Sequence, residues 1–220
     1  MPLPVDFKLY LITDRKQAKV PLPRAVRSAL EGGIGAVQLR EKDLPIRELI
    51  SLARELRGLT REFGAKLIIN DRADVAVDVG ADGVHLGHAS MPPAAVRRVV
   101  GPAMLIGVST HTKEEALGAE SGGADFVTFG PIFETPSKKG LGAPVGKEVI
   151  RSVQCSIEIP LFALGGINTG NALKVFGAGA TGIAMISSVI AADDITKAAR
   201  KFVRIADFME RIACNSCTPR

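Results

Sequence analysis

Residues 122–140 read Gly-Gly-Ala-Asp-Phe-Val-Thr-Phe-Gly-Pro-Ile-Phe-Glu-Thr-Pro-Ser-Lys-Lys-Gly. The apolar run 124–129 predicts a buried strand, because it combines aromatic and β-branched residues in a length typical of strands. The two glycines before it are typical of a helix end, where a residue without a Cβ lets the chain turn back toward a sheet. The stretch therefore predicts a helix end, a buried strand and a loop in immediate succession.

The loop after this strand is cationic and conformationally restrained. Its backbone contains two prolines, each of which restricts φ. Loops in this position contact substrates in many α/β enzymes, so we expect this one to hold an anion. Taken alone, a Thr-Pro-Ser-Lys sequence is equally compatible with a solvated turn. The residues that we expect to contact the anion are Thr135, Pro136, Ser137 and Lys138, with Lys139 beside them.

The same succession recurs along the chain at intervals of roughly 20 to 30 residues, which is the pattern of repeated βα units. The eight predicted strands cover residues 8–13, 36–40, 66–70, 83–86, 104–108, 125–129, 160–164 and 182–186. Apolar residues at helical spacing predict helices over 22–31, 46–63, 73–79, 93–100, 113–121, 145–153, 168–176 and 195–213.

Eight strands that alternate with eight helices predict the α/β class and a single (β/α)₈ TIM barrel. We expect one domain over residues 1–220, with the barrel over about 8–205 and a frayed tail over about 214–220. Cys214 and Cys217 in that tail have the spacing of half a zinc knuckle, but no second ligand pair lies near them in the sequence. We expect two free thiols there.

Composition narrows the class of protein. A hydrophobic content of 46% with 23% charged residues is typical of a globular protein, and no apolar run approaches the roughly 20 residues that span a bilayer. The net charge is +5, yet Lys and Arg are dispersed and the chain has one Tyr and no Trp to stack on bases. We therefore expect a cytoplasmic protein that binds phosphorylated small molecules, and neither nucleic acid nor a membrane. A homodimer is one alternative for the oligomeric state.

Polar residues end almost every predicted strand, and in a barrel these ends converge on one mouth. Alternation points Gln38, Arg40 and Lys42 to one side, where they suit a diphosphate beside a heterocycle. At the next strand end, Asp71 could bind Mg²⁺ and Asn70 a phosphate or an amino-heterocycle. The alternatives are an ordinary charged surface cluster for the first set and an Asx turn for the second.

A second phosphate-binding region is predicted where the last two strands end. Glycines in Gly165-Gly-Ile-Asn168 allow a close backbone approach, and Ile186-Ser187 follows the eighth strand. A plain tight turn is the alternative for the glycine pair. Two phosphate-binding regions at opposite sides of one mouth suggest two phosphorylated substrates.

The three histidines differ in their prospects. His85 lies within a predicted strand as a candidate hydrogen-bonded core residue, and His88 lies in a loop, where we expect solvation. His111 follows the fifth strand and is the candidate acid or base.

Together these motifs resemble the thiamine phosphate synthase and thiazole tautomerase superfamily over about residues 8–200. The motifs that carry the resemblance are Tyr10-Leu-Ile-Thr-Asp14, Gln38-Leu-Arg-Glu-Lys42, Asn70-Asp-Arg72, Gly80-Ala-Asp-Gly-Val-His-Leu-Gly87, Ile106-Gly-Val-Ser109, Gly130-Pro-Ile-Phe133, Thr135-Pro-Ser-Lys138, Gly165-Gly-Ile167 and Ile186-Ser187.

The resemblance implies a transferase of thiamine biosynthesis that joins hydroxymethylpyrimidine diphosphate to a thiazole phosphate, releasing diphosphate. By the same resemblance Gln38, Arg40, Lys42 and Asn70 hold the pyrimidine diphosphate and Asp71 binds Mg²⁺. Contacts to the diphosphate or the thiazole side come from Ser109, Thr135, Ser137 and Lys138, and Gly166, Ile186 and Ser187 take the thiazole phosphate. Arg40, Lys42, Ser109 and Lys138 are the catalytic candidates, since cations stabilise the leaving diphosphate.

One position departs from the synthase pattern. Synthases of this superfamily usually carry a second carboxylate where this chain has Ser90. This position and His111 resemble the thiazole tautomerase branch, which isomerises thiazole phosphate carboxylate without metal; there His111 would move the proton, with Glu134 a weaker candidate. The intact pyrimidine-side set favours the synthase. A barrel that binds thiamine precursors without turnover is the third alternative.

Overall fold

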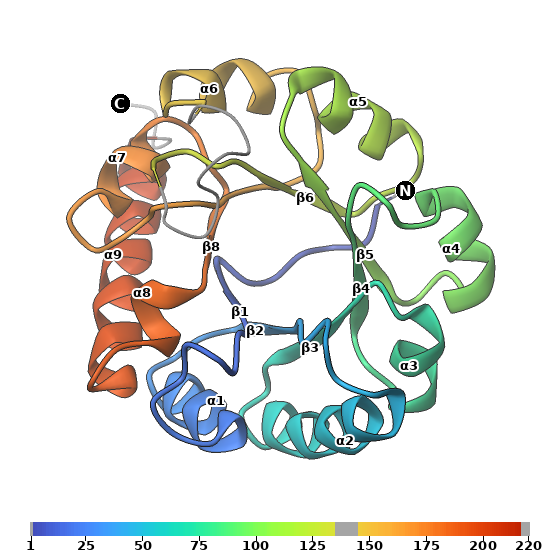
Figure 1. The fold of residues 1–220 in the computed structure, drawn as a ribbon. Coiled ribbons are helices and arrows are strands. Elements are labelled where there is room, and N and C mark those ends of the chain that lie inside the picture. Colours follow the sequence, from blue (N-terminus) through green and yellow to red (C-terminus); the bar gives the residue numbers. More distant parts are fainter. Residues whose placement is uncertain (1, 135–144, 217–220) are drawn as a thin grey trace.

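The computed structural model describes residues 2–134 and 145–216, with the side chains of 213–216 excepted. The eight strands close into one parallel barrel in chain order (Figure 1). They are β1 (Leu9–Ile12), β2 (Ala36–Leu39), β3 (Lys66–Asn70), β4 (Gly83–Leu86), β5 (Leu105–Thr110), β6 (Phe126–Phe129), β7 (Leu161–Ala163) and β8 (Gly182–Met185). The predicted (β/α)₈ barrel is therefore confirmed.

Helices surround the barrel in Figure 1. They are α1 (Leu22–Glu31), α2 (Ile46–Glu62), α3 (Ala73–Asp78), α4 (Pro93–Val100), α5 (Lys113–Ser121), α6 (Glu148–Gln154), α7 (Ala172–Gly177), α8 (Ser187–Ile190) and α9 (Ile195–Ser216). Within the described residues no helix is long and apolar enough to cross a membrane.

Several boundaries differ from the sequence expectation. The helix expected from residue 168 begins at Ala172, because the side chain of Asn171 accepts a hydrogen bond from the Asn168 backbone at 2.8 Å and holds a turn there. The short helix α8 was not predicted. The last helix continues to Ser216, into the segment where we expected a frayed tail, and Cys217 lies outside the described residues.

Two apolar layers stabilise the barrel. The larger lies between strands and helices; the smaller fills the interior with Phe7, Tyr10, Phe126 and Phe162. Phe7 comes from the N-terminal segment, which crosses the barrel in the view of Figure 1. Its ring packs edge-on against Phe126 at 5.8 Å between ring centroids. Gly107 makes room for this filling, since a Cβ there would lie 2.3 Å from the Phe126 ring. Large and small residues on neighbouring strands thus close one end of the barrel and leave the other as a mouth.

Candidate active site

Two of the pockets in the described part of the chain lie at the mouth and contain residues that the sequence predicted for the site. The first, here the β7–β8 pocket, has a volume of about 320 Å³ and follows strands β7 and β8. The second, the β2–β3 pocket, has a volume of about 280 Å³ and follows strands β2 and β3. Several of the sequence-predicted residues line one or the other of these two pockets.

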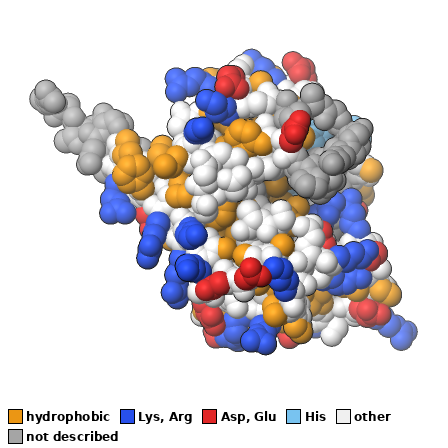
Figure 2. Space-filling view, turned by 60° about the vertical axis from the view of Figure 1, so that its left-hand side comes forward, with side chains coloured by type: hydrophobic (Ala, Val, Ile, Leu, Met, Phe, Trp, Pro, Cys, Tyr) orange, Lys and Arg blue, Asp and Glu red, His pale blue; other side chains and the backbone are white. Residues whose placement is uncertain are grey.

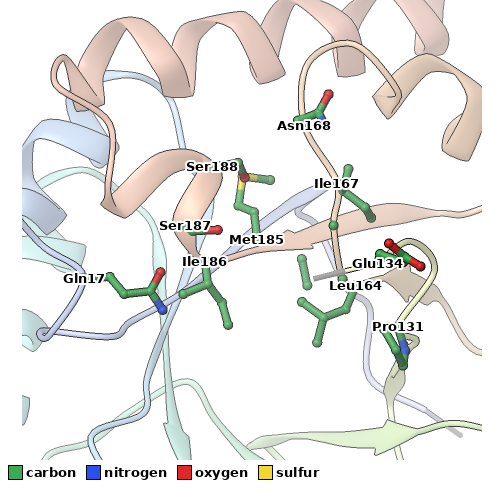
Figure 3. A pocket seen from close by; sticks show the side chains of 13 residues that line it. Gln17, Pro131, Glu134, Leu164, Ile167, Asn168, Met185, Ile186, Ser187 and Ser188 are labelled. Carbon is green, nitrogen blue, oxygen red and sulfur yellow. The ribbon is translucent and has the colours of Figure 1, made fainter. Parts of the chain in front are cut away.

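The β7–β8 pocket contains all three residues expected to bind a thiazole phosphate, Gly166, Ile186 and Ser187. Gln17 and Ile186 lie on one side of it, with Leu164 and Glu134 opposite (Figure 3). Gly166 has a left-handed φ of 63°, and a Cβ there would lie 2.5 Å from the Glu134 carbonyl oxygen. Only glycine fits this backbone without strain.

The β2–β3 pocket brings together Lys42, Asn70 and Asp71. Asp71 has a positive φ of 63°, and no other non-glycine residue among those described has a positive φ. Its backbone N–H donates to the His85 carbonyl at 2.8 Å, which fixes the residue after β3 ends. A left-handed conformation costs roughly 1 kcal/mol or more in a residue with a Cβ, and such strain is concentrated at functional sites.

Ser90 lies directly on the Asp71 carboxylate. Its hydroxyl donates to Asp71 Oδ1 at 2.6 Å and accepts from the Gly87 backbone N–H at 2.8 Å. Ser90, the position at which the sequence departs from the pattern it resembles, is therefore adjacent to Asp71 in space, and it supplies a neutral oxygen. Among the described residues there is no group of three or more His, Cys, Asp or Glu that could hold a metal ion unaided.

A chain of buried polar groups crosses the barrel below the mouth. Gln38 Nε2 donates to the Tyr10 hydroxyl at 2.8 Å, and that hydroxyl lies 3.4 Å from His85 Nδ1. On the other side His85 Nε2 lies 3.0 Å from Ser109 Oγ, with Thr128 Oγ1 also near at 3.4 Å. The chain connects Gln38 on β2 with Ser109 on β5.

His85 in the middle of this chain is neutral. Burial and, to a smaller extent, the positive charge of Arg40 together lower its pKa to about 3. A neutral imidazole donates from one nitrogen and accepts at the other. Since the Tyr10 hydroxyl already accepts from Gln38, it can donate to Nδ1, so that Nε2–H donates to Ser109. The Gln38 carbonyl oxygen and the Ser109 hydroxyl proton are thereby left for other partners.

Arg40 and Lys42 lie beyond the end of β2, which stops at Leu39, so strand alternation does not place them as expected. Arg40 is held through its backbone N–H, which donates to Thr13 Oγ1 at 2.9 Å. Its charge still acts on His85 in the barrel interior. Thr135, Pro136, Ser137 and Lys138 lie outside the described residues.

His111 and His88 are both exposed. His111 Nδ1 contacts the Gly130 carbonyl oxygen, and its backbone N–H donates to Glu115 at 2.6 Å. A carbonyl oxygen only accepts, so Nδ1 carries a proton. In a neutral imidazole with this contact, Nε2 would have the lone pair of a base.

Both the sequence and the fold of this chain are similar to those of known proteins. Residues 9–189 match the sequence model of the family described as "Thiamine monophosphate synthase". The chain belongs to the thiamine monophosphate synthase family. It is 48% identical to a thiamine-phosphate synthase of Chloroflexus aurantiacus over 90% of this chain and 91% of that protein. It is 46% identical to one of Moorella thermoacetica, over 89% and 94%.

A solved structure shows the same fold at high similarity. The thiamine phosphate pyrophosphorylase of Pyrococcus furiosus has a TM-score of 0.85 and 42% identity to this chain, with 92% of this chain and 96% of that chain covered.

Two features of the site were not predicted from the sequence. Gln17 lines the β7–β8 pocket of this chain, and the Tyr10 hydroxyl accepts a hydrogen bond from Gln38. Tyr10 stood within a quoted motif, whereas nothing in the sequence around Gln17 marked it.

Proposed function

We propose that this protein is a thiamine phosphate synthase, which joins hydroxymethylpyrimidine diphosphate to a thiazole phosphate or its carboxylate. The bond between the pyrimidine methylene carbon and the diphosphate oxygen breaks, a bond from that carbon to the thiazole nitrogen forms, and diphosphate leaves. Where the second substrate is the carboxylate, its carboxyl group also leaves, as CO₂. One observation carries the proposal: Lys42, Asn70 and Asp71 share one pocket, while Gly166 and Ser187 line another. Two separate anion sites suit two phosphorylated substrates.

The β2–β3 pocket is the site that we assign to the pyrimidine diphosphate. Arg40 and Lys42 supply positive charge for the departing diphosphate, which is worth more in a site from which the substrates exclude water. Gln38 and Ser109 are held by the buried chain through His85, so the Gln38 carbonyl oxygen can accept from the pyrimidine and the Ser109 hydroxyl can donate to a phosphate oxygen. Thr135, Pro136, Ser137 and Lys138 stay a prediction as further contacts. No residue acts as a nucleophile.

The β7–β8 pocket is the site that we assign to the thiazole phosphate. Gly166 allows the backbone to approach the phosphate, and Ser187 offers a hydroxyl at the start of α8. Ile186 and Leu164 line the same pocket and suit the flat apolar ring.

Mg²⁺ fits the residues around Asp71. Protein sites for Mg²⁺ usually provide one or two carboxylates and leave the remaining positions to water and substrate phosphates. Asp71 provides a carboxylate, and the Ser90 hydroxyl at 2.6 Å adds a neutral oxygen. When bound, the ion would neutralise charge on the diphosphate, while Asp71 and Ser90 would hold it beside the β2–β3 pocket.

The thiazole tautomerase is the second candidate, because a neutral hydroxyl stands beside Asp71 and a neutral His111 would have a basic Nε2. The two functions separate in a pair of variants. Asp71→Asn should lower synthase turnover by about 10²-fold or more, because it removes the carboxylate that would hold Mg²⁺, whereas a tautomerase should be unaffected. His111→Ala should lower the turnover of a tautomerase and leave the turnover of a synthase unaffected.

The first measurement follows thiamine phosphate and diphosphate from purified protein, pyrimidine diphosphate, thiazole phosphate carboxylate and Mg²⁺, with a metal-free control. Asp78→Asn serves as the matched control, since Asp78 lies in α3 and pairs with Arg54 at 3.0 Å on the surface. No product from the wild type, together with isomerisation of the thiazole alone, would replace the synthase with the tautomerase. Binding without any turnover would support the non-catalytic alternative.

A further inference from the structure

The loop between β1 and α1 is tied to the loop between β2 and α2 by one arginine. Arg15 donates from its backbone N–H to Glu41 Oε1 at 3.0 Å and from Nη1 to Glu41 Oε2 at 3.0 Å. Its guanidinium also contacts both carboxylate oxygens of Asp43, at 2.6 Å from Nη1 and 3.0 Å from Nη2. We call these three residues the Arg15 clamp.

Glu41 is the buried member of the clamp. Its side chain has 2% exposure, compared with 32% for Arg15 and 46% for Asp43. A buried carboxylate is costly unless it is paired and hydrogen-bonded, and Arg15 supplies both a cation and two donors. Arg15, followed by Lys16, also holds the pKa of Asp43 well below its ordinary value, so that Asp43 stays ionised.

In the sequence, Glu41 of the clamp lies between the two cations assigned to the diphosphate. Arg40 precedes Glu41 in the chain and Lys42 follows it, while Asp43 is the next residue. The Leu44 N–H donates to the Glu41 carbonyl at 3.2 Å, and the Arg40 N–H donates to Thr13. The backbone that carries both cations is therefore fixed from both sides, although β2 has already ended.

We propose that Arg15 is a positioning residue for the diphosphate-binding cations: through Glu41 and Asp43 it holds the backbone of residues 40–43 in the geometry that presents Lys42 to the β2–β3 pocket and Arg40 to the mouth at the end of β2. Arg40 does not line that pocket itself but stands between Leu39 and Glu41, which do. The inference rests on the proposed function. Arg15 itself pairs with two carboxylates and does not line the β2–β3 pocket. Without the clamp, the diphosphate would have to order this loop at each binding event, which weakens binding.

The test is the kinetics of Arg15→Ala. We expect the KM for pyrimidine diphosphate to rise about tenfold or more and the KM for thiazole phosphate to change less than about threefold, because the β7–β8 pocket is built by other strands. Arg15→Lys should give an intermediate value, since an ammonium keeps the charge but cannot make the forked contacts. A merely structural role would lower the active fraction and leave both KM values unchanged.

Arg27→Ala is the matched control. Arg27 makes an equally forked ion pair with Glu62, at 2.7 and 2.8 Å, between α1 and α2 of the same two βα units. It lies in the helical layer, so its loss should leave both KM values within about twofold of the wild type. If Arg15→Ala does not fold, Asp43→Asn removes the exposed arm of the clamp and should raise the same KM by about threefold.

A binding measurement separates failure of this inference from failure of the proposed function. Calorimetry with inorganic diphosphate and Mg²⁺ needs no turnover, and Arg15→Ala should weaken binding about tenfold relative to wild type and Arg27→Ala. Equal affinity in all three proteins, or equal KM values where turnover is measured, would overturn the role of Arg15. A wild type that binds diphosphate but makes no thiamine phosphate would overturn the proposed function. The diphosphate affinities of the three proteins would still decide whether Arg15 positions the cations.

Discussion

Replacing Gly166 by alanine should damage both stability and the β7–β8 pocket. The residue has a φ of 63°, and an added Cβ would meet the Glu134 carbonyl oxygen at 2.5 Å and the Phe133 Cβ at 2.7 Å. Contacts below about 3 Å with backbone atoms are relieved only by moving the chain. The strand-end loops that carry Gly166 and Glu134 would therefore separate, and the pocket between them would change shape.

The magnitude follows from two contributions. A left-handed conformation costs a residue with a Cβ about 1 to 2 kcal/mol, and overpacking of a rigid site costs about 1 to 3 kcal/mol. Gly166→Ala should therefore lower the free energy of unfolding by about 2 to 5 kcal/mol. For a chain of this size each kcal/mol shifts Tm by about 2 to 4 °C, so Tm should fall by at least about 4 °C.

The matched control is Gly177→Ala in α7 of the same βα unit. A Cβ at Gly177 meets nothing within 4 Å, and alanine is favoured over glycine within helices by about 0.5 to 1 kcal/mol. Calorimetric Tm and the KM for thiazole phosphate should both separate the two variants: Gly166→Ala loses stability and raises the KM more than about tenfold, while Gly177→Ala gains stability at unchanged KM. Wild-type Tm and KM in Gly166→Ala would refute the reasoning.

Three further predictions concern charge. The pKa of His85 is lowered from 6.5 to about 3 in the folded state. As pH falls below about 6.5, the unfolded chain therefore binds a proton at His85 that the folded chain does not, and the free energy of unfolding decreases. Urea unfolding at pH 7 and pH 5 should therefore show about 2 kcal/mol more loss in the wild type than in His85→Gln, and equal losses would contradict the neutral His85. Ser90→Asp places a second carboxylate beside Asp71 and should lower the Mg²⁺ concentration for half-maximal activity about tenfold, while reducing Tm in metal-free buffer by like-charge repulsion; an unchanged Mg²⁺ titration would exclude a metal at Asp71. Asp125 is buried, pairs with Arg97 at 2.6 Å and accepts from the Leu3 and Ile106 N–H groups at 2.7 Å, so Asp125→Ala should cost about 3 to 5 kcal/mol in urea unfolding; a cost below about 1 kcal/mol would show that the pair is dispensable.

The barrel was predictable because its signals are local. Each strand is a short apolar run, several of them after a glycine, and most helices show their own periodicity, so neighbouring residues suffice to place them. The strands 66–70 and 83–86 and the helices 22–31, 93–100 and 113–121 have the predicted bounds. The four residues of α8 are too few to show a period, and it was missed for that reason.

The candidate site was predictable only as far as one rule reaches, namely that strand ends converge on one mouth. That rule placed Asn70, Asp71, Gly166 and Ser187 near the mouth, but it could not say which of them share a pocket. The division into the β2–β3 and β7–β8 pockets depends on how loops from different βα units pack.

The contacts that distinguish this chain join loops that are distant in sequence. Ser90 reaches Asp71 from the loop after the neighbouring strand. Arg15 contacts Glu41 and Asp43 directly, although α1 and β2 separate them in the sequence. His85 joins Tyr10 to Ser109 through the barrel interior. No spacing rule encodes such pairs, because a charged or polar residue in a loop looks the same in sequence whether it faces solvent or a partner. Local patterning was enough to choose the barrel, whereas the packing of neighbouring βα units chose the partners of the loop residues. Closure of the barrel then brought His85 within reach of both Tyr10 and Ser109.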